Sequence, residues 1–456
     1  MKNSDKDPII AIATASGRGG IGILRLSFKK DLATRFSEAL FGAHVILKDR
    51  YAHLLPIHDL EGQILDRAIV LYFPAPHSYT GESVIEIQAH GGPVLMSMLL
   101  RVCLEKCKGL DLRMAEPGEF TKRAFLNGQM DLTQAEAVTD LIDAVSESAV
   151  QAAGRSLSGE FSKRIKQVDE EVAELRAFVE ATLDFPEEEI DVLSSAVVTK
   201  RLEGVRESLS KILAQAQQGS ILREGVTVAI VGSPNVGKSS LLNALAEEEV
   251  AIVTDIPGTT RDRIEHWVSL KGIPVKMVDT AGIRDTADIV ESKGIERTLA
   301  EIRKADIVLH LLDASGRVSD DVEVLRKVLS EVRQGVPLLT VKNKADLCQE
   351  SSETTELRIS AKQGIGLEAL KDKVLDVVGM ATTVDGLFMA RERHLACLRE
   401  AMEHIEIAQK ISISMPMPEL FAEELRWASK AFDEILGETT TEDLLGLIFS
   451  KFCIGK

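Results

Sequence analysis

The chain has 456 residues, of which 45% are hydrophobic, 27% are charged and 4% are aromatic, and its formal net charge is −17. This length predicts two to four domains, and no apolar run approaches the roughly 18 uncharged residues that a membrane span needs. The acidic balance argues against a protein coated with basic patches for nucleic acid, and the few aromatic residues argue against stacking platforms for single strands.

The first predicted segment, residues 1–120, is a small domain that combines strands with one helix. Four β-rich runs, IIAIAT, IGILRLS, RAIVLYF and VIEIQ, precede an expected helix over Gly92–Cys107. This order indicates an α/β or α+β fold. The opening residues MKNSDKDPIIAIAT lack the basic and apolar regions of a signal peptide, and the five cysteines form no paired framework, so we expect a cytoplasmic protein.

The later segments predict an all-α domain into which an α/β domain is inserted. Over residues 121–219 the composition is helical, and PEEEID interrupts the pattern after Phe185. Residues 220–379 alternate strands and helices, which predicts a mostly parallel sheet. Helical composition returns over residues 380–456. The apolar positions of the first helical pattern are Leu132, Ala135, Val138, Leu141, Ile142 and Val145.

The run VTVAIVGSPNVGKSSLLNAL predicts a phosphate-binding loop. Gly232-x-x-x-x-Gly237-Lys238-Ser239 follows a predicted strand, Val226–Val231, and opens a helix, which is the context that this motif needs. Glycines let backbone N–H groups surround phosphates, and the helix N-terminus adds positive potential. We expect Lys238 to reach the β- and γ-phosphates and the Ser239 hydroxyl to bind Mg²⁺. The predicted nucleotide contacts in this loop are Asn235, Val236, Gly237, Lys238, Ser239 and Ser240.

Three further stretches predict that the nucleotide is GTP. Asp279-Thr280-Ala281-Gly282 follows a predicted strand, with Asp279 expected behind Mg²⁺ and the Gly282 N–H facing the γ-phosphate. Asn343-Lys344-Ala345-Asp346 ends another strand, and a carboxylate there can accept two hydrogen bonds that guanine offers and adenine does not. Ser360-Ala361-Lys362 can place a backbone N–H on guanine O6.

A threonine-rich stretch between the P-loop helix and the next strand predicts a switch segment. It runs Thr254-Asp255-Ile256-Pro257-Gly258-Thr259-Thr260. The Thr260 hydroxyl is the natural second ligand of Mg²⁺, ordered only when a γ-phosphate is present.

The means of hydrolysis is less evident from the residues. Many GTPases orient water with a glutamine after the DTAG glycine, but this chain has Ile283 there, so another group must orient the water. No arginine finger is evident, and a monovalent cation bound by Asn235 and switch carbonyls could neutralise the same charge. The acids that could orient the water, among which the local sequence does not choose, are Asp285, Asp288, Glu291 and Glu296.

The C-terminal segment predicts two helices and a packed tail. The first helix runs over Glu419–Leu436, with Pro418 at its start and Gly437 as a left-handed cap. Thr441 caps a second, short helix that leads to the tail FCIGK. We expect these apolar residues to face inward: Leu425, Phe432 and Ile435 on the first helix, and Leu444, Leu447, Ile448 and Phe452 on the second.

The cysteines before the tail carry no predicted site. Cys103 and Cys107 lie four residues apart on a predicted helix without a histidine or cysteine cluster, so we expect core packing and not zinc. Cys348 and Cys397 are likewise expected to have no functional role.

Several stretches together resemble one family. They are GRGGIGILRLS and HSYTGESVIEIQAHGGP, PGEFTKRAFLNGQMDLTQAEAVTDLI and TLDFPEEEID, GSPNVGKSSLLN, TDIPGTTRD and DTAGIR, and finally FCIGK. Over its full length the chain resembles the MnmE (TrmE) family of tRNA modification GTPases. The resemblance implies a homodimer held by its N-terminal domains and a heterotetramer with the flavoprotein MnmG. It also implies C5 modification of the tRNA wobble uridine (U34), to an aminomethyl or carboxymethylaminomethyl group, with 5-formyl- or 5,10-methylene-tetrahydrofolate.

The resemblance also assigns residue roles. It implies K⁺ ligands at Asn235, Thr254, Ile256 and Thr259, the second and third through their carbonyls, and Mg²⁺ ligands at Ser239 and Thr260. Glu291 falls at the position of the water-orienting acid. The implied folate contacts are Arg25, Glu86, Gln129 and Lys456, although relatives often carry Arg or Lys where this chain has Gln129. Cys453, near the folate site, is implied as nucleophile, general acid or spectator.

The folate pair also has a chemical rationale and a simpler alternative. A carboxylate such as Glu86 can pair with the N–H edge of a pterin, and Arg25 can bind a glutamate carboxylate. The simpler reading is a salt bridge at a strand end.

Two other functions compete with wobble modification. One is a GTPase that regulates ribosome assembly without a one-carbon site, and the other is a dimeric scaffold with a vestigial nucleotide site. The intact Lys238, Ser239, Asp279 and Asp346 argue against the scaffold.

Overall fold

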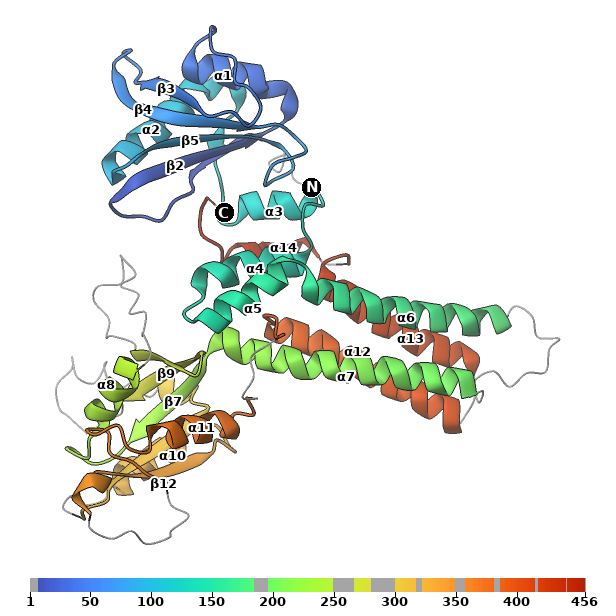
Figure 1. The fold of residues 1–456 in the computed structure, drawn as a ribbon. Coiled ribbons are helices and arrows are strands. Elements are labelled where there is room, and N and C mark those ends of the chain that lie inside the picture. Colours follow the sequence, from blue (N-terminus) through green and yellow to red (C-terminus); the bar gives the residue numbers. More distant parts are fainter. Residues whose placement is uncertain are drawn as a thin grey trace. The chain divides into compact units, whose positions relative to one another are not determined.

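Two six-stranded sheets organise the part of the chain that the structure, a computed structural model, describes. The described residues are 7–183, 196–248, 266–279, 300–316, 322–348, 357–380, 386–414, 417–439 and 441–455. The chain divides into a first unit, residues 1–139 with 432–456, and a second unit, residues 140–431 (Figure 1). In the described residues no helix combines the length and the apolar character that crossing a membrane requires.

The first unit is built on a sheet with strand order β3-β4-β5-β2-β1-β6. Because side chains alternate across a strand, Leu24, Leu26 and Ile85 enter the core under α1 and α2, while Arg25 and Glu86 point to the opposite face. The elements are β1 (Ile9–Ile12), β2 (Gly19–Phe28), η2 (Lys30–Leu32), α1 (Ala33–Phe41), β3 (His53–His58), β4 (Ile64–Phe73), β5 (Ser83–Gly91), α2 (Pro93–Lys106), η3 (Lys108–Leu110) and β6 (Arg113–Met114).

The four predicted strands and the predicted helix of this sheet are confirmed, but α1 and β3 were not predicted. The strand β3 has the sequence HLLPIH, and proline normally argues against a strand because it cannot donate to the ladder. Pro56 is tolerated because β3 is the edge strand of the sheet.

Helix α3 (Glu119–Leu126) packs on the face of the sheet that carries Arg25. Its Phe120 is fully buried against Ile9 and Ala11 of β1, and Tyr79 lies partly buried beside them. This small cluster therefore forms a second, local core opposite the main one.

The C-terminal helices behave largely as predicted. Leu425, Phe432 and Ile435 of α13 (Pro418–Leu436) are fully buried, and Gly437 has a φ of 90°. The Thr441 hydroxyl accepts a hydrogen bond from Leu444 N at 3.4 Å and caps α14 (Glu442–Phe449).

The predicted inward face of α14 was partly wrong. Leu444 and Leu447 are 37% and 65% exposed. The buried face is instead Leu445, Ile448, Phe449 and Phe452, which follow helical steps of three, one and three residues and pack on Leu132 and Ala135 of α4 (Leu132–Asp143). The other departures lie at the end of α4, where Ile142 is 46% exposed and Val145 lies beyond the helix.

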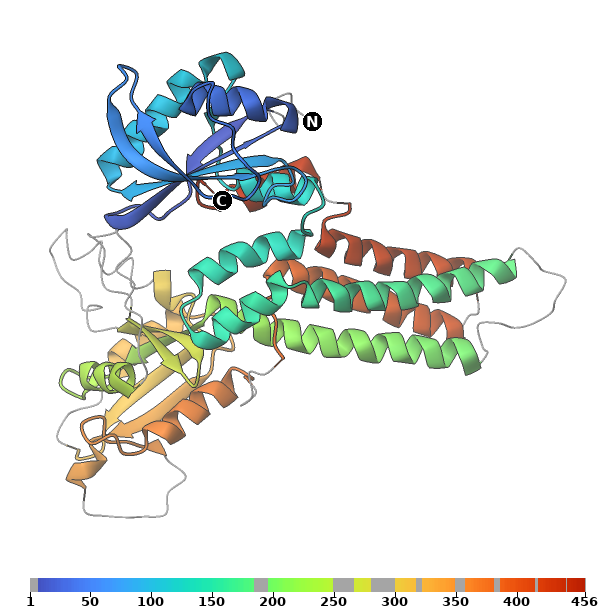
Figure 2. The ribbon, with the colours of Figure 1, turned by 45° about the horizontal axis from the view of Figure 1, so that its top comes forward.

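The second unit combines long helices with the second sheet. Helices α6, α7, α12 and the first part of α13 lie side by side in Figures 1 and 2. The ring of Phe161 stacks on that of Phe388 at 4.4 Å between centroids, and a Cβ at Gly219 would overlap the Phe388 carbonyl. The helices of this unit outside the sheet domain include α5 (Glu147–Leu157), α6 (Glu160–Leu183), α7 (Ala196–Glu224) and α12 (Glu392–Ser414).

The second sheet has strand order β12-β11-β10-β7-β9-β8 and is parallel except for the β8–β9 hairpin. This confirms the predicted alternation of strands and helices and, with the other elements, the predicted fold class. The elements are β7 (Val226–Val231), α8 (Lys238–Glu248), β8 (His266–Leu270), β9 (Ile273–Asp279), β10 (Ile307–Asp313), α10 (Val322–Glu331), β11 (Leu338–Asn343), η4 (Ala345–Leu347), β12 (Leu357–Arg358) and α11 (Leu367–Val377).

One hydrophobic cluster joins this sheet to the long helices. Ala149 of α5 and Leu222 of α7 pack in the same core as Val268 of β8 and Val275 of β9. The Ser148 hydroxyl also donates to the carbonyl of Gly272 in the hairpin turn. The four predicted domain boundaries, 1–120, 121–219, 220–379 and 380–456, stay predictions.

Candidate functional site

The predicted P-loop forms a tight turn that leads into α8. Asn235 and Gly237 have φ values of 63° and 102°, and α8 begins at Lys238. The Lys238 ammonium donates to the carbonyls of Gly232 and Ser233 at 2.6 and 3.2 Å, and so stays inside the loop. A Cβ at Gly232 would lie 2.5 Å from the carbonyl of Leu311. The loop therefore requires glycine for its close packing as well as for its turn.

The predicted base-binding residues meet the P-loop through Asn343. Its Nδ2 donates to Val236 O at 2.9 Å, and its Oδ1 accepts from Ala361 N at 3.0 Å. The Ser360 hydroxyl donates to Asp346 Oδ1 at 2.6 Å. The structure thus brings together the P-loop, Asn343-Lys344-Ala345-Asp346 and Ser360-Ala361-Lys362.

Asp313, which lies at the same sheet edge, was not predicted from the sequence. It ends β10, its side chain is fully buried, and it accepts from Lys344 Nζ at 2.8 Å. Burial raises its pKa, but the hydrogen bonds from Lys344 and Ser315 outweigh burial, so the pKa lies below the usual value. Its position directly after the apolar run IVLHLL was the signal that could have revealed it.

Two of the predicted cation ligands lie within the described residues. Ser239, in the first turn of α8, and Asn235 are both exposed, so their oxygens are accessible to cations beside a bound triphosphate. Asp279 ends β9, next to β7, which leads into the P-loop. Some of the predicted residues lie outside the described residues: Thr254, Asp255, Ile256, Pro257, Gly258, Thr259, Thr260, Thr280, Ala281, Gly282, Glu291 and Lys456.

The first unit holds the Arg25–Glu86 pair. Arg25 Nε donates to Glu86 Oε1 at 2.9 Å, and the two residues are directly opposite on the antiparallel strands β2 and β5. Their side chains are 21% and 14% exposed. The pair lies within the strands and not at a strand end. In the described part of the chain the two Nη groups of Arg25 have no hydrogen-bond partner, so they can receive a carboxylate.

The loop 79–82 beside this pair is tied to α3 and to the residues after it. The hydrogen bonds are Tyr79 Oη with Thr121 Oγ1 (2.8 Å), Asn127 Nδ2 to Thr80 O (2.7 Å) and Arg123 Nη1 to Glu82 Oε2 (3.0 Å). Gly81 has a φ of 75°, and a Cβ there would lie 3.1 Å from Gln129 Nε2. The loop 79–82 therefore approaches Gln129 as well as α3.

Buried ion pairs fix the start of α3. Glu119, which is 5% exposed, accepts from Arg113 Nη2 at 2.6 Å and from Arg123 Nη2 at 2.7 Å. Burial raises the pKa of Glu119, but these bonds and the backbone N–H of Glu116 lower it below the usual value. Glu119 is therefore a buried carboxylate that stays charged.

The C-terminal tail is anchored at the start of α3. The carbonyl of Cys453 accepts from Gly118 N at 3.3 Å, and Ile454 forms an antiparallel bridge with Pro117. The Cys453 side chain is exposed.

The tail also approaches β1. A Cβ at Gly455 would overlap the carbonyl of Ile12, at the end of that strand. The preceding residue, Ala11, is paired in register with Arg25. The tail that carries Cys453 thus contacts the strand adjacent to the Arg25–Glu86 pair.

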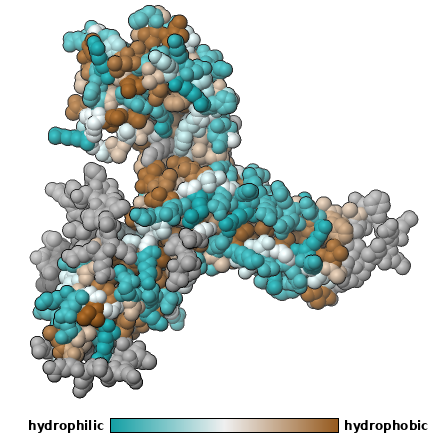
Figure 3. All heavy atoms as spheres, in the orientation of Figure 1, coloured by the Kyte–Doolittle hydropathy of each residue, from teal (hydrophilic) through white to brown (hydrophobic). Residues whose placement is uncertain are grey.

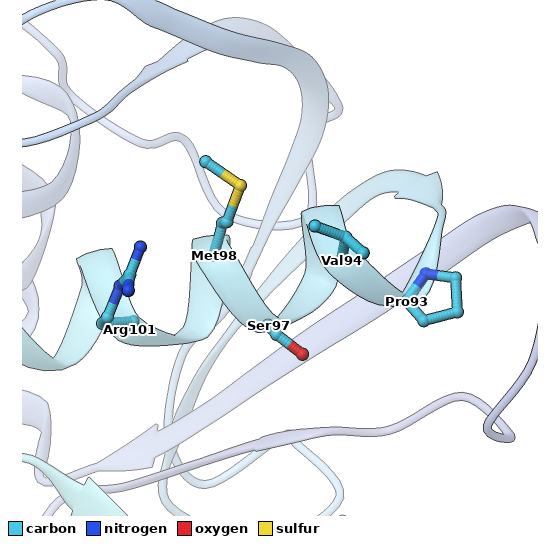
Figure 4. Close-up of a pocket in the computed structure, with 5 residues that line it drawn as sticks. All are labelled: Pro93, Val94, Ser97, Met98 and Arg101. Carbon is cyan, nitrogen blue, oxygen red and sulfur yellow. The ribbon is translucent and has the colours of Figure 1, made fainter.

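One open pocket lies elsewhere in the first unit. It measures about 530 Å³ and follows α2 along Pro93, Val94, Ser97, Met98 and Arg101 (Figure 4). None of these is a predicted site residue. Because α2 covers the main core, this pocket lies on the side of the sheet away from Arg25 and Glu86. We therefore assign no function to it.

The predicted core packing of Cys103 and Cys107 is confirmed. Cys103 and Cys107 are buried in the main core, where burial raises both of their pKa values to about 12. Cys397 is also buried, in α12, while Cys348 is partly buried and donates to Ala314 O at 3.1 Å. Among the described residues no group of three or more His, Cys, Asp or Glu is placed to hold a metal ion.

Comparisons with known proteins cover the whole chain. The family model described as "MnmE helical domain" matches residues 132–453, and the one described as "GTP-binding protein TrmE N-terminus" matches residues 8–129. The tRNA modification GTPase MnmE of Burkholderia ambifaria is 50% identical over 469 residues, covering 100% of both chains. Those of Burkholderia cenocepacia and Burkholderia thailandensis are 50% and 49% identical, again over 100% of both chains.

A solved structure matches over part of the chain. A variant of Aquifex aeolicus Era bound to GDP·AlF4⁻ is 28% identical, covers 39% of this chain and 66% of its own, and has a TM-score of 0.27.

Proposed function

The chain belongs to the MnmE family of tRNA modification GTPases, and from this premise we propose that its GTP hydrolysis serves C5 modification of the wobble uridine (U34) of certain tRNAs. The product carries an aminomethyl or carboxymethylaminomethyl group. Its one-carbon unit comes from 5-formyl- or 5,10-methylene-tetrahydrofolate. GTP and Mg²⁺ follow from the GTPase family itself, whereas K⁺ and folate are part of the proposal.

The observation that carries the folate proposal is the half-buried Arg25–Glu86 pair. Glu86 offers a carboxylate for the N–H edge of a pterin, and the Nη groups of Arg25 can bind a carboxylate of the glutamate tail. Gln129, beside the loop 79–82, adds a neutral donor. We include Lys456 as a further contact and place the exposed Cys453 thiol near the one-carbon unit.

In the nucleotide site we propose a division of roles. Lys238 balances the charge of the phosphates, while Asp346, oriented by Ser360, accepts hydrogen bonds from guanine. Mg²⁺ bound by Ser239 and Thr260 would supply charge stabilisation. The remaining proposed GTP contacts are Asn235, Val236, Gly237, Ser240, Thr254, Asp255, Ile256, Pro257, Gly258, Thr259, Asp279, Thr280, Ala281, Gly282, Asn343, Lys344, Ala361 and Lys362.

The hydrolytic step in this proposal uses K⁺ and an acid. Asn235, Thr254, Ile256 and Thr259 would hold K⁺, which would supply the positive charge of an arginine finger and favour dimerisation of the G domains. Glu291 orients the attacking water.

We further propose a cytoplasmic homodimer that assembles with MnmG. Apolar side chains that remain at the surface of the first unit are visible in Figure 3. Leu54 and Ile69 are 67% and 42% exposed and directly opposite on β3 and β4. An exposed apolar pair on an open sheet face supports a partner surface there.

Calorimetry with 5-formyltetrahydrofolate tests the one-carbon site. Wild type is expected to bind, while Arg25→Ala and Glu86→Ala each weaken binding by about ten-fold or more, the effect of losing a charged hydrogen bond. Arg67→Ala, which removes an exposed arginine from the same sheet, is the control and should bind as wild type does. Absence of binding to the wild type would contradict the proposal and favour a GTPase that regulates ribosome assembly.

GTP turnover in K⁺ and in Na⁺ tests the cation. Turnover should be faster in K⁺, and Asn235→Ala should remove that difference. Equal rates in the two salts would rule out K⁺ as the arginine substitute.

A further inference from the structure

Tyr79 lies against the guanidinium of Arg25. The Cζ atom of Arg25 is 5.4 Å from the centroid of the Tyr79 ring and 5.9 Å from that of Phe120. These distances are within the range of cation–π attraction. Glu86 accepts a hydrogen bond from Arg25 Nε at 2.9 Å. The guanidinium is thus bounded by one carboxylate and two rings.

The Tyr79 ring is itself fixed. Its hydroxyl shares a 2.8 Å hydrogen bond with Thr121 Oγ1, and Thr121 is fully buried on α3. Burial raises the pKa of the Tyr79 phenol, while Thr121 and the Arg25 charge act in the opposite direction, and the net pKa is above the usual 10. The phenol is therefore protonated at neutral pH and can donate.

This arrangement controls the direction of the Arg25 side chain. Arginine loses much rotamer freedom when it is ordered, and a contact that orders it before binding reduces that loss when ligand arrives. We propose that Tyr79, held by Thr121, is a positioning residue that orients the guanidinium of Arg25 toward a carboxylate of the folate ligand. This inference rests on the proposed folate site and adds to it two residues that act through Arg25.

Substitutions at Tyr79 separate the ring from its hydroxyl. With 5-formyltetrahydrofolate as the probe, Tyr79→Leu should raise Kd about ten-fold, because both the ring and its tie to α3 are lost. Tyr79→Phe keeps the ring and should restore most of the affinity, to within about three-fold of wild type. The matched control is Tyr72→Phe, which removes a buried tyrosine hydroxyl, 3.2 Å from Ser83 Oγ, on the other face of the sheet, and should not change Kd.

A double-mutant cycle with Arg25→Ala decides whether Tyr79 acts through Arg25. If it does, Tyr79→Leu adds little to the loss already caused by Arg25→Ala, less than about two-fold. An undiminished ten-fold effect in the Arg25→Ala background would overturn the proposal, because Tyr79 would then contact ligand directly or support the fold. No effect of Tyr79→Leu in the Arg25→Ala background and in wild type alike would also overturn it.

Urea unfolding of the same four proteins gives a readout that does not need folate. A non-additive effect of the two substitutions on the unfolding midpoint supports the contact that fixes the guanidinium, and additive effects contradict it. If wild type binds no folate, the proposed function fails, yet this cycle still tells whether Tyr79 holds Arg25. If Tyr79→Leu does not fold, Tyr79→Phe replaces it in the cycle. Loss of the hydrogen bond to Thr121 should then weaken folate binding, by up to about three-fold, in wild type and not in the Arg25→Ala background, and an equal effect in both would overturn the proposal.

Discussion

Single side chains hold the nucleotide loops of the second unit together. The Asn343 side chain donates from Nδ2 to Val236 in the P-loop and accepts at Oδ1 from Ala361, in the loop after β12. Asn343 was predicted as a GTP contact, and this second role was not foreseen. Its partners lie 107 and 18 residues away in the chain, and only the register of the parallel strands brings them near.

The buried carboxylate Glu119 predicts an acid-sensitive first unit. Because folding lowers its pKa, Glu119 stabilises the native state above its unfolded pKa, and that contribution is lost as pH falls through the folded pKa. Glu119→Gln should lower the free energy of unfolding by up to about 3 kcal/mol at pH 7, since buried Arg123 loses one of its two carboxylate partners and keeps Glu82.

The difference between Glu119→Gln and wild type should shrink as urea unfolding is repeated at pH values that fall below the ordinary range of a glutamate pKa, since the folded-state pKa of Glu119 is lower still. Glu207→Gln is the control, since that exposed glutamate pairs with exposed Lys211 and should leave the midpoint unchanged. A gap that stays constant with pH would contradict the role of the Glu119 charge.

Thiol reactivity should follow burial. Exposed Cys453 should react with iodoacetamide well before Cys103 and Cys107, whose pKa values of about 12 leave almost no thiolate at pH 8. Peptide mass spectrometry over a time course measures the order, and Cys453→Ser removes the fast site as a control. Equal rates at the three thiols would mean that α2 does not shield its cysteines.

At the scale of elements, the predictions succeeded where one pattern dominated. The apolar spacing of α13 and the caps at Gly437 and Thr441 are local signals, and the structure bears them out. Helix α14 is apolar on more than one side, so the spacing alone could not tell whether Leu444 or Leu445 faces inward. The partner surface on α4 decides this, and it is more than 300 residues away in the chain.

Helix α7 predicts a steric test. Gly219→Ala should destabilise the second unit by about 1–3 kcal/mol or more, because the added methyl overlaps the Phe388 carbonyl and the backbone must shift. Gly204→Ala on the same helix meets open space and should stabilise by about 0.5–1 kcal/mol. Thermal unfolding measures both, and equal effects would show that α7 does not pack on residues 386–390 as described.

At the scale of the whole molecule, the sequence predicted the kinds of fold and the order in which they occur. Motifs with fixed spacing indicated the P-loop and its companions, because their chemistry is local. Tyr79, Thr121 and Asp313 were not found, because each acts through a partner that the fold supplies. The sequence also did not predict that α5 and α7 share one core with the second sheet. No local pattern shows that apolar residues on the two sides of a predicted domain boundary pack together.

Removal of residues 453–456 should abolish the proposed wobble modification and leave GTP hydrolysis nearly unchanged. The truncated chain loses the contacts of Cys453 and Ile454 with residues 117–118, which costs about 1–2 kcal/mol of unfolding free energy. GTP turnover should stay within about two-fold of wild type, while wobble modification is lost. Mass spectrometry of tRNA from cells that carry the truncated chain measures this, and normal modification would mean that the tail is dispensable.

The first unit draws its sheet from one end of the chain and α14 with the tail from the other. During translation, β1 leaves the ribosome long before Gly455 is made, and domains generally fold as they emerge. Leu132 and Ala135 of α4 therefore stay uncovered until α14 is made. A polypeptide that stops before residue 441 would therefore have the sheet that carries the P-loop but would lack α14 and the residues 453–455 on which the proposed modification depends.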